Sequence, residues 1–216
     1  MKSDAAIRED VEAELKWTPD VDETDIAVKV KNGEVTLTGF VADYLGKYQA
    51  EVAAKRIMGV SAVANDIQVR PYSDAATDPE IARAAVTALK FALPLSHEAV
   101  KVLVHEGKVT LEGTLEWNFQ RDIAVSAVRR LSGVTSVFNL IRLEPKAAPH
   151  DIKQKIEAAF QRIAQVDAGK ITVDAQGSDV TLRGEVRSWA EHDQAQQTAW
   201  AAPGVSNVKN EIRVRV

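Results

Sequence analysis

The chain has 216 residues, of which 45% are hydrophobic and 27% are charged, and its formal net charge is −4. This composition is typical of globular proteins, and the acidic balance argues against nucleic-acid binding, which usually needs a basic surface. The sequence contains no cysteine, which excludes disulfides, thiolate metal sites and a cysteine nucleophile.

The sequence shows neither a membrane-spanning segment nor a secretory signal. No apolar run approaches the roughly 20 residues that a spanning helix needs. The N-terminal stretch MKSDAAIREDVEAEL is rich in acids and lacks the apolar core of a signal peptide. We therefore expect a cytoplasmic protein, with a periplasmic location only if a signal has been removed.

The first predicted elements are a helix and a hairpin. Residues 4–17 place Ile7, Val11 and Leu15 four residues apart, a spacing that lines one face of a helix. Two alternating runs follow, IAVKV at residues 26–30 and EVTLTGFV at residues 34–41. They are separated by Asn-Gly, which tolerates positive φ at both positions and predicts a two-residue hairpin turn.

A second helix and a third strand are predicted next. Asp43 can cap a helix whose inner stripe contains Ala50 and Ala53. Gly59 lies where helices commonly end in the left-handed conformation. The run ANDIQVR at residues 64–70 then closes the unit as a strand.

The same order of elements recurs twice along the chain. The phrase NGEVTLTG at residues 32–39 returns as EGKVTLEG at 106–113 and as GSDVTLRG at 177–184, a period of 74 and then 71 residues. Self-similarity at such a period is typical of tandem domains. We expect domains at residues 1–71, 76–145 and 149–216. The recurring residues, which we interpret as structural, are Gly33, Gly39, Gly59, Gly107, Gly113, Gly133, Gly184, Gly204, Asn65, Asn139 and Asn210.

The predicted fold class is α+β, with three tandem αββαβ units. Each unit is expected to form a three-stranded mixed sheet with two helices on one face. Gly39 and its equivalents are expected at a bulge or a tight exit into the second helix. The linkers at residues 71–77 and 145–149 are short, so we expect the copies to touch, with loosely strung domains as the alternative.

The helix starts differ between the copies. In the second copy, Asp78 is predicted to cap the first helix, ahead of Pro79. In the third copy, Ser188 and Glu191 have the spacing of a capping box at the second helix. The second copy carries Trp117 at that position, and Asn118 is expected to act as the substitute cap.

No catalytic constellation is predicted. The four histidines, His97, His105, His150 and His192, fall at non-equivalent positions, and no nucleophile or nucleotide-binding motif is present. The run DVDETD at residues 20–25 resembles a calcium loop but lacks the glycine and the bidentate glutamate that such a loop needs. We therefore expect no enzymatic activity, no cofactor and no metal site. A potassium site built from backbone carbonyls would leave no signature in the sequence.

One candidate surface stands out in the second copy. Trp117 and Phe119 lie beside Arg121 at the start of the second helix, with Arg129 and Arg130 at its far end. Aromatic and basic side chains at an exposed helix start can dock on lipid headgroups. Packing of the two aromatic residues against a neighbouring copy or its linker is the interpretation that we favour for such small tandem domains.

Two further observations bear on contacts with other molecules. Trp17 and Phe91 lie at the ends of the first helices, where we expect core edges or contacts between copies. The first copy carries the whole negative excess, with 13 acidic against 9 basic residues, so it is the least suited to an anionic bilayer.

The repeat unit resembles the BON domain (bacterial OsmY and nodulation). The resemblance is carried by G-x-V-x-[S/D] at residues 39–43 and 184–188, and by G-V-x-x-V-x-N at residues 59–65, 133–139 and 204–210. It covers almost the whole chain in three copies, and the second copy departs from it at Trp117. It implies a non-enzymatic bacterial module of the osmotic-stress, transport-associated kind, which is proposed to bind phospholipid surfaces.

The predicted function is therefore a non-enzymatic binding module of the osmotic or envelope-stress type. Its predicted partner is an anionic phospholipid surface or an envelope-associated protein. Two alternatives are a cytoplasmic potassium-ion sensor, which one member of the family implies, and a protein–protein interaction scaffold.

Overall fold

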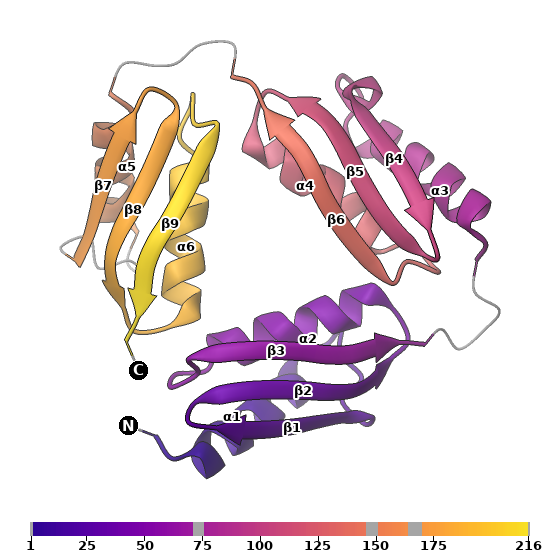
Figure 1. Ribbon diagram of the computed structural model, residues 1–216, viewed down its shortest axis with the longest axis vertical. Helices are drawn as coiled ribbons and strands as arrows, with labels where there is room; N and C mark the ends of the chain where they lie inside the picture. Colours follow the sequence, from indigo (N-terminus) through magenta and orange to yellow (C-terminus); the bar gives the residue numbers. More distant parts are fainter. Residues whose placement is uncertain (1, 71–75, 146–150, 164–169, 216) are drawn as a thin grey trace.

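The computed structural model describes residues 2–70, 76–145, 151–163 and 170–215, which form three αββαβ copies (Figure 1). Copy 1 contains α1 (Asp4–Trp17), β1 (Ile26–Lys31), β2 (Glu34–Val41), α2 (Tyr44–Arg56) and β3 (Ala62–Val69). Copy 2 contains α3 (Asp78–Ala92), the 3-10 helix η1 (His97–Ala99), β4 (Val100–His105), β5 (Lys108–Leu115), α4 (Asn118–Arg129) and β6 (Ser136–Leu143). Copy 3 contains α5 (Ile152–Arg162), β7 (Ile171–Gln176), β8 (Asp179–Val186), α6 (Trp189–Trp200) and β9 (Asn207–Val214). Most of both predicted linkers, and His150, lie outside the described residues.

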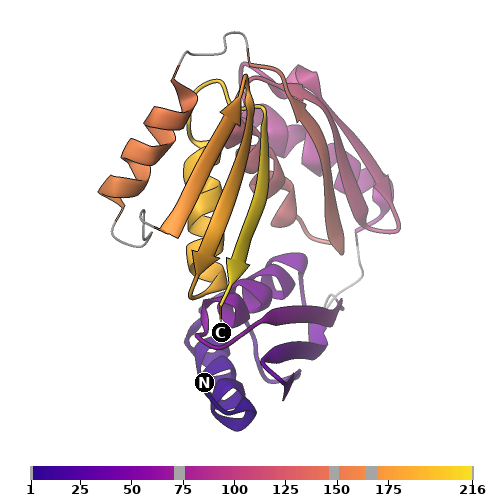
Figure 2. The ribbon, with the colours of Figure 1, turned by 60° about the vertical axis from the view of Figure 1, so that its left-hand side comes forward.

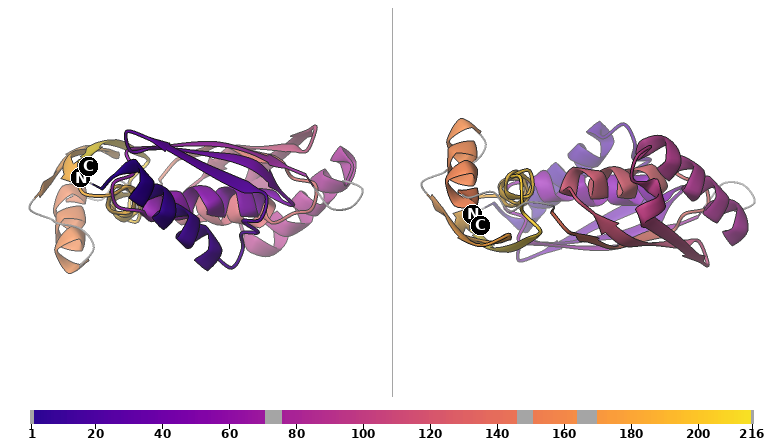
Figure 3. Two further views of the ribbon diagram at one scale, coloured as in Figure 1. Left: turned by 90° about the horizontal axis from the view of Figure 1, so that it is seen from below. Right: turned by 90° about the horizontal axis from the view of Figure 1, so that it is seen from above.

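Each copy has its own three-stranded mixed sheet, which confirms the predicted fold class. The middle strand pairs antiparallel with the first strand and parallel with the third, as β2 does with β1 and β3. Both helices of a copy lie on the same face of its sheet (Figure 3). In copy 1 the core between these layers contains Val35 and Leu37 of β2, Ile7 and Val11 of α1, and Ala53 of α2. The small alanines allow α2 to pack close to the sheet.

The hairpin turns have the predicted backbone conformation. Asn32 and Gly33 have φ values of 52° and 78°, and Glu106 and Gly107 have 51° and 71°. Positive φ at both turn residues is the type I′ arrangement, whose twist matches that of the flanking strands. In copy 3 only the first turn residue, Gly177, has positive φ, at 62°, which is compatible with the predicted II′ turn. The recurring Gly59, Gly133 and Gly204 are also left-handed, at 97°, 84° and 90°.

The glycine in the middle strand of each copy marks neither a bulge nor the exit into the second helix, so both forms of that prediction are wrong: β2 continues to Val41 and α2 begins only at Tyr44. Pairing is uninterrupted up to Gly39 on the β1 side, where Ile26 is its partner, and it continues through Gly39 on the β3 side. The glycine is needed because the backbone passes very close to the residue that precedes the first strand. A Cβ at Gly39 would lie 1.8 Å from the carbonyl oxygen of Asp25, and one at Gly113 would lie 1.9 Å from that of Ala99.

Carboxylates at the start of the first helix hold the hairpin turns of copies 1 and 2. Asp78 accepts hydrogen bonds from the backbone N–H groups of Glu106 and Gly107, both at 2.9 Å. Asp4 does the same for the turn of copy 1, at 2.8 and 2.9 Å. The predicted helix cap at Asp78 is therefore wrong: Thr77 is the N-cap, and Asp78 is the first helical residue. The two N–H donors lower the pKa of Asp78 below its usual range.

The Asp78→Asn substitution is expected to remove an acid-sensitive part of the stability of copy 2. Because the pKa of Asp78 is lower in the folded chain than in the unfolded one, its contribution is present above the unfolded pKa and is lost as the pH falls through the folded one. Urea unfolding should show a constant deficit for the variant near neutral pH that shrinks below about pH 4. A deficit that stays unchanged in strong acid would contradict this role.

The second helices of copies 1 and 3 begin with side-chain caps. Asp43 accepts a hydrogen bond from the backbone N–H of Gly46 at 2.8 Å, as predicted. Ser188 accepts from the N–H of Glu191 at 3.2 Å, which confirms one half of the predicted capping box. The other half differs, since the Glu191 carboxylate accepts from the N–H of Arg187 at 2.9 Å.

The second helix of copy 2 begins without such a cap. Trp117 occupies the N-cap position, and Asn118 is the first helical residue, so the predicted substitute cap is wrong. The side-chain oxygen of Gln120 accepts a hydrogen bond from the N–H of Trp117 at 3.0 Å. This bond satisfies the backbone group that precedes the helix.

The three copies close into a ring. They surround a common centre, and α2, α4 and α6 are the helices nearest to it (Figures 1 and 2). Copy 3 contacts copy 1 directly, since the indole N–H of Trp189 donates to the carbonyl oxygen of Ser61 at 3.0 Å. The expectation that the copies touch is therefore confirmed, and it extends to the first and last copies.

Candidate functional site

The second helices meet at a central junction, which we define as the contacts among α2, α4 and α6. Arg129, near the end of α4, lies with its guanidinium 3.5 Å from the ring centroid of Tyr48 on α2. Trp200, at the end of α6, lies under the guanidinium of Arg121 on α4 at 4.3 Å. In both contacts the last turn of one helix reaches the first half of the helix in the preceding copy.

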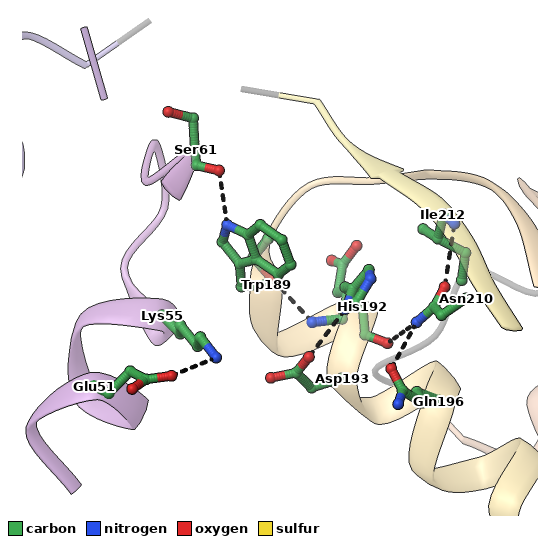
Figure 4. Close-up of polar contacts among 11 residues, drawn as sticks. Glu51, Lys55, Ser61, Trp189, His192, Asp193, Gln196, Asn210 and Ile212 are labelled. Carbon is green, nitrogen blue, oxygen red and sulfur yellow. Dashed lines mark hydrogen bonds and ion pairs between the residues drawn. The ribbon is translucent and has the colours of Figure 1, made fainter. Parts of the chain in front are cut away.

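The contact between copies 1 and 3 follows the same arrangement (Figure 4). Lys55, in the last turn of α2, holds the repeat position of Arg129 and Trp200, and it forms an ion pair within α2 with Glu51 at 2.9 Å. Burial acts to lower the pKa of Lys55, but the bond to Glu51 and the charge of Asp193 on α6 outweigh it, and the pKa is raised. The junction therefore has approximate threefold symmetry, and such a repeated head-to-tail contact closes a ring.

The central junction contains a cavity of about 450 Å³ whose lining comes from all three copies. Most of its charged groups lie on α4, and the remaining one lies on α6. Its lining includes Arg121, Asp122, Arg129, Asn139, Asp193 and Gln196.

Burial changes the acid–base behaviour of two neighbouring groups in this lining. It lowers the pKa of Arg121, although the charge of Asp122 acts against this change. It also raises the pKa of Asp122, against the opposing effects of Arg121 and of a hydrogen bond from Asn118. Perturbed groups in a cleft are more common at binding sites than elsewhere.

The recurring asparagine behaves differently in copy 2. In copy 3, Asn210 donates from its side-chain nitrogen to the side-chain oxygen of Gln196 at 3.2 Å. In copy 1, Asn65 donates at the same offset to the Glu51 carboxylate at 3.4 Å. In copy 2, Val125 stands on α4 at the position of this polar side chain. Asn139 therefore has no such partner on α4, and it lines the central cavity.

The structure separates the residues of the predicted lipid surface. Arg121 and Arg129 lie in the central junction, whereas Arg130 is exposed at the far end of α4. Trp117 and Phe119 lie together with ring centroids 6.4 Å apart, and they are 36% and 58% exposed. Neither is buried, and the packing of these aromatic residues against a neighbouring copy or its linker stays a prediction, because most of both linkers lies outside the described residues.

Exposed apolar residues gather at one end of copy 2, which we call the apolar tip: Phe91, Leu95, Trp117 and Phe119. Phe91 lies in the last turn of α3 and is 83% exposed, and Leu95 follows in the next turn with 99% exposed. A hydrogen bond of 3.0 Å from Gln120 to Ser96 joins this turn to the start of α4.

Two predictions about the ends of the first helices are wrong. Trp17 and Phe91 were expected at core edges or contacts between copies, but each is 83% exposed. In copy 2, Leu93 enters the core and Leu95 stays in solvent, whereas the equivalent of Leu95 in copy 1, Val21, is buried. The sequence does not reveal the exposure of Leu95, because Leu93 and Leu95 are equally suited to the one core position after the first helix.

Copy 2 also differs from its neighbours on the outer face of its sheet. Leu103, Phe138 and Leu140 are each more than half exposed there. Their equivalents in copy 3 are charged, namely Asp174, Lys209 and Glu211. Nine of the eleven exposed large apolar side chains among the described residues belong to copy 2. A comparison of the copies at outward strand positions would have revealed this difference from sequence.

The histidines lie at separate places in the described parts of the chain. His97 is in η1, and His105 ends β4. His192 on α6 contacts Asp193 through its Nδ1 at 2.9 Å and lies against Trp189. Within residues 2–70, 76–145, 151–163 and 170–215 no cluster of three or more metal-ligating side chains occurs, and no helix there has the length and apolar character to cross a bilayer.

Known proteins share the repeat that builds this ring. The family model described as BON domain matches residues 3–71, 77–145 and 150–216. The chain belongs to the BON domain family. It is 33% identical over 141 residues to osmotically-inducible protein Y of Escherichia coli (strain K12), in an alignment that covers 63% of this chain and 70% of that protein.

Two solved structures of CdsD, a structural protein of the type III secretion system of Chlamydia trachomatis, are also similar to this BON protein. Each has 13% sequence identity and a TM-score of 0.27. The alignments cover 96% of this chain and 91% of the first structure, and 100% of both chains for the second. A TM-score this low supports no inference about fold or function.

The features that recur in all three BON copies are structural. The hairpin turn, the glycine in the middle strand and the inward valines appear in each copy and build each core. The apolar tip and the charged lining of the central cavity do not recur. The distinguishing chemistry of this BON protein is therefore carried by side chains that one copy has and the others lack.

Proposed function

We propose that this chain is a non-enzymatic stress-response protein that docks on phospholipid surfaces through the apolar tip of copy 2. Membership of the BON family and the name of its relative in Escherichia coli, osmotically-inducible protein Y, support the stress-response class. The observation that carries the docking surface is the exposure of Leu95, at 99%, beside Phe91, Trp117 and Phe119.

A lipid surface suits the shape and chemistry of the apolar tip. Leu95 protrudes from a turn, and Phe119 lies on the first turn of a helix, so these side chains can enter a bilayer without unfolding either element. Transfer of apolar surface out of water contributes about 25 cal/mol per Å². Tryptophan, here Trp117, favours the boundary between headgroups and acyl chains.

Burial of apolar side chains is expected to dominate over charge. Arg121 and Arg129 are held in the central junction, and Arg130 lies about 16 Å from Phe119 by the rise of the helix. The exposed charges nearest in sequence to the tip are of both signs, Lys90, Glu98 and Asp122. We therefore expect this protein to bind neutral vesicles as well as anionic ones.

Vesicle flotation tests the proposed docking surface. The full chain is expected to float with vesicles of phosphatidylcholine, alone or mixed with phosphatidylglycerol. The Leu95→Ser, Phe119→Ser double variant should bind at least about tenfold more weakly, because two large apolar side chains no longer leave water. The matched control is Trp17→Ser, Met58→Ser, which removes two exposed apolar residues of copy 1.

Two outcomes would reject the docking surface. One is that the unmodified chain fails to float with either vesicle. The other is that the copy 1 control loses as much binding as the copy 2 variant, because the effect would then follow general surface polarity and not the apolar tip. Circular dichroism of each variant checks that the fold is retained.

A further inference from the structure

Two arginine side chains of the central junction stack on aromatic rings of other copies, and neither makes an ion pair with a carboxylate of the described residues. Arg129 contacts the ring of Tyr48 through its flat face, and its Nε is buried without a hydrogen-bond partner. Arg121 lies in the same way on Trp200 and donates to the side-chain oxygen of Asn118. Asp122, on the same helix, is the carboxylate whose charge acts on both guanidinium groups.

Stacking on an aromatic ring occupies the face of a guanidinium and leaves its edge available. The N–H groups point outward in the plane of the group, so a stacked arginine can still donate two parallel hydrogen bonds to a carboxylate or a phosphate. The ring also fixes the orientation of the side chain before a ligand arrives, which lowers the entropy cost of binding. Arg129 and Arg121 are both held in this way.

Neutral donors line the same cavity. Gln196 accepts a hydrogen bond from Asn210 through its side-chain oxygen, which leaves its NH₂ group as a donor. The side-chain oxygen of Asn139 accepts from the N–H of Ile141 at 3.1 Å, so its NH₂ group is likewise a donor. Both side chains line the cavity with the two arginines.

The two carboxylates of the cavity limit the charge that a ligand can carry. Asp193 faces the positive side chain of Lys55 and contacts the ring of His192. Asp122 accepts from Asn118 at 2.8 Å and experiences the positive charges of both arginines. The two carboxylates offset the two guanidinium charges, so an anion in the cavity must be held by directed hydrogen bonds to the arginine edges and not by net charge, which disfavours an extended polyanion.

We propose that the central junction binds a small molecule that carries a carboxylate or a phosphate group, which is held by the edge of Arg129 with Arg121 and the two amides as further donors. The cavity, of about 450 Å³, has room for such a molecule. Because the lining comes from all three copies, the bound molecule also links them. This site is independent of the apolar tip.

Isothermal titration calorimetry on the full chain tests the site, with sodium phosphate and sodium succinate as probes at constant ionic strength. We expect at least one probe to bind. The Arg129→Gln variant should bind about tenfold more weakly or worse, because a charge-assisted hydrogen-bonded pair is lost. The matched control is Arg130→Gln, which removes the same charge one residue away on the exposed surface and should change the affinity by less than about twofold.

A second variant keeps the test valid if Arg129→Gln perturbs the fold. The Arg129→Lys change retains the charge and much of the packing but loses the planar fork, so it should bind with intermediate affinity. The proposal is overturned if neither probe binds the unmodified chain, or if Arg129→Gln and Arg130→Gln have equal effects.

Vesicle flotation of the Arg129→Gln variant distinguishes the two possible sources of the oxyanion, a soluble molecule and a lipid headgroup. Retained binding of Arg129→Gln to anionic vesicles would assign a soluble molecule, and loss of binding would assign a lipid headgroup. Either result supports the site when the calorimetry does.

Discussion

The Gly184→Ala substitution is expected to unfold copy 3, at a cost of at least about 4 kcal/mol. Gly184 lies in the middle strand with φ +146°, and a Cβ there would lie 2.0 Å from the carbonyl oxygen of Lys170. Both partners of this clash are backbone or rigidly attached to it, so no side-chain rotation relieves it. A unit of about 70 residues has too little stability to absorb such a loss.

The matched control is Gly177→Ala in the hairpin turn of the same copy. Gly177 also has positive φ, at +62°, but nothing lies within 4 Å of an added Cβ. The expected cost is about 1 kcal/mol, from the backbone conformation alone. Urea unfolding followed by circular dichroism should show the loss of one third of the structure only for Gly184→Ala. Equal costs at both positions would show that backbone conformation, and not close approach, makes the recurring glycine necessary.

The Trp189→Ala substitution is expected to open the ring between copies 1 and 3. Trp189 packs against the core of copy 1 and donates its indole N–H to Ser61, so one side chain provides both apolar and polar contact across this interface. Loss of such an anchor costs about 2 kcal/mol or more. Each copy keeps its own core, so the protein should remain folded while small-angle X-ray scattering shows a larger radius of gyration.

Two controls separate the parts of this contact. Trp189→Phe keeps an aromatic ring but loses the N–H donor, and it should cost about 1 kcal/mol. Trp17→Ala removes a tryptophan that is 83% exposed and should leave the radius of gyration unchanged. A Trp189→Ala variant as compact and as stable as the unmodified chain would mean that the remaining contacts of the central junction hold the ring closed.

The fold of one copy was predictable because its signals are local. Alternating strands, a turn at Asn32 and Gly33 and a helix with Val11 and Leu15 on one face depend on residues within a few positions of each other. Repetition strengthened each of these signals by showing them three times. The predictions that failed involve partners distant in sequence. The sequence predicts a helix cap at Asp78 because its real partner, the turn at Gly107, lies 29 residues away.

The candidate sites were predictable only in part. The sequence drew attention to Trp117, Phe119 and the arginines of α4, but it could not separate them. Helix geometry alone leaves open which side chains meet solvent and which meet another copy. The structure turns Arg121 and Arg129 toward Trp200 and Tyr48, which belong to other copies.

The sequence by itself determined the repeat, the order of elements in each copy and the family, because these follow from short-range patterns written three times. Only the tertiary structure decided that the copies close into a ring, that two arginines face a shared cavity and that Leu95 remains in solvent. The physical reason is that contacts between copies depend on the relative placement of surfaces from distant parts of the chain. No local periodicity encodes that placement.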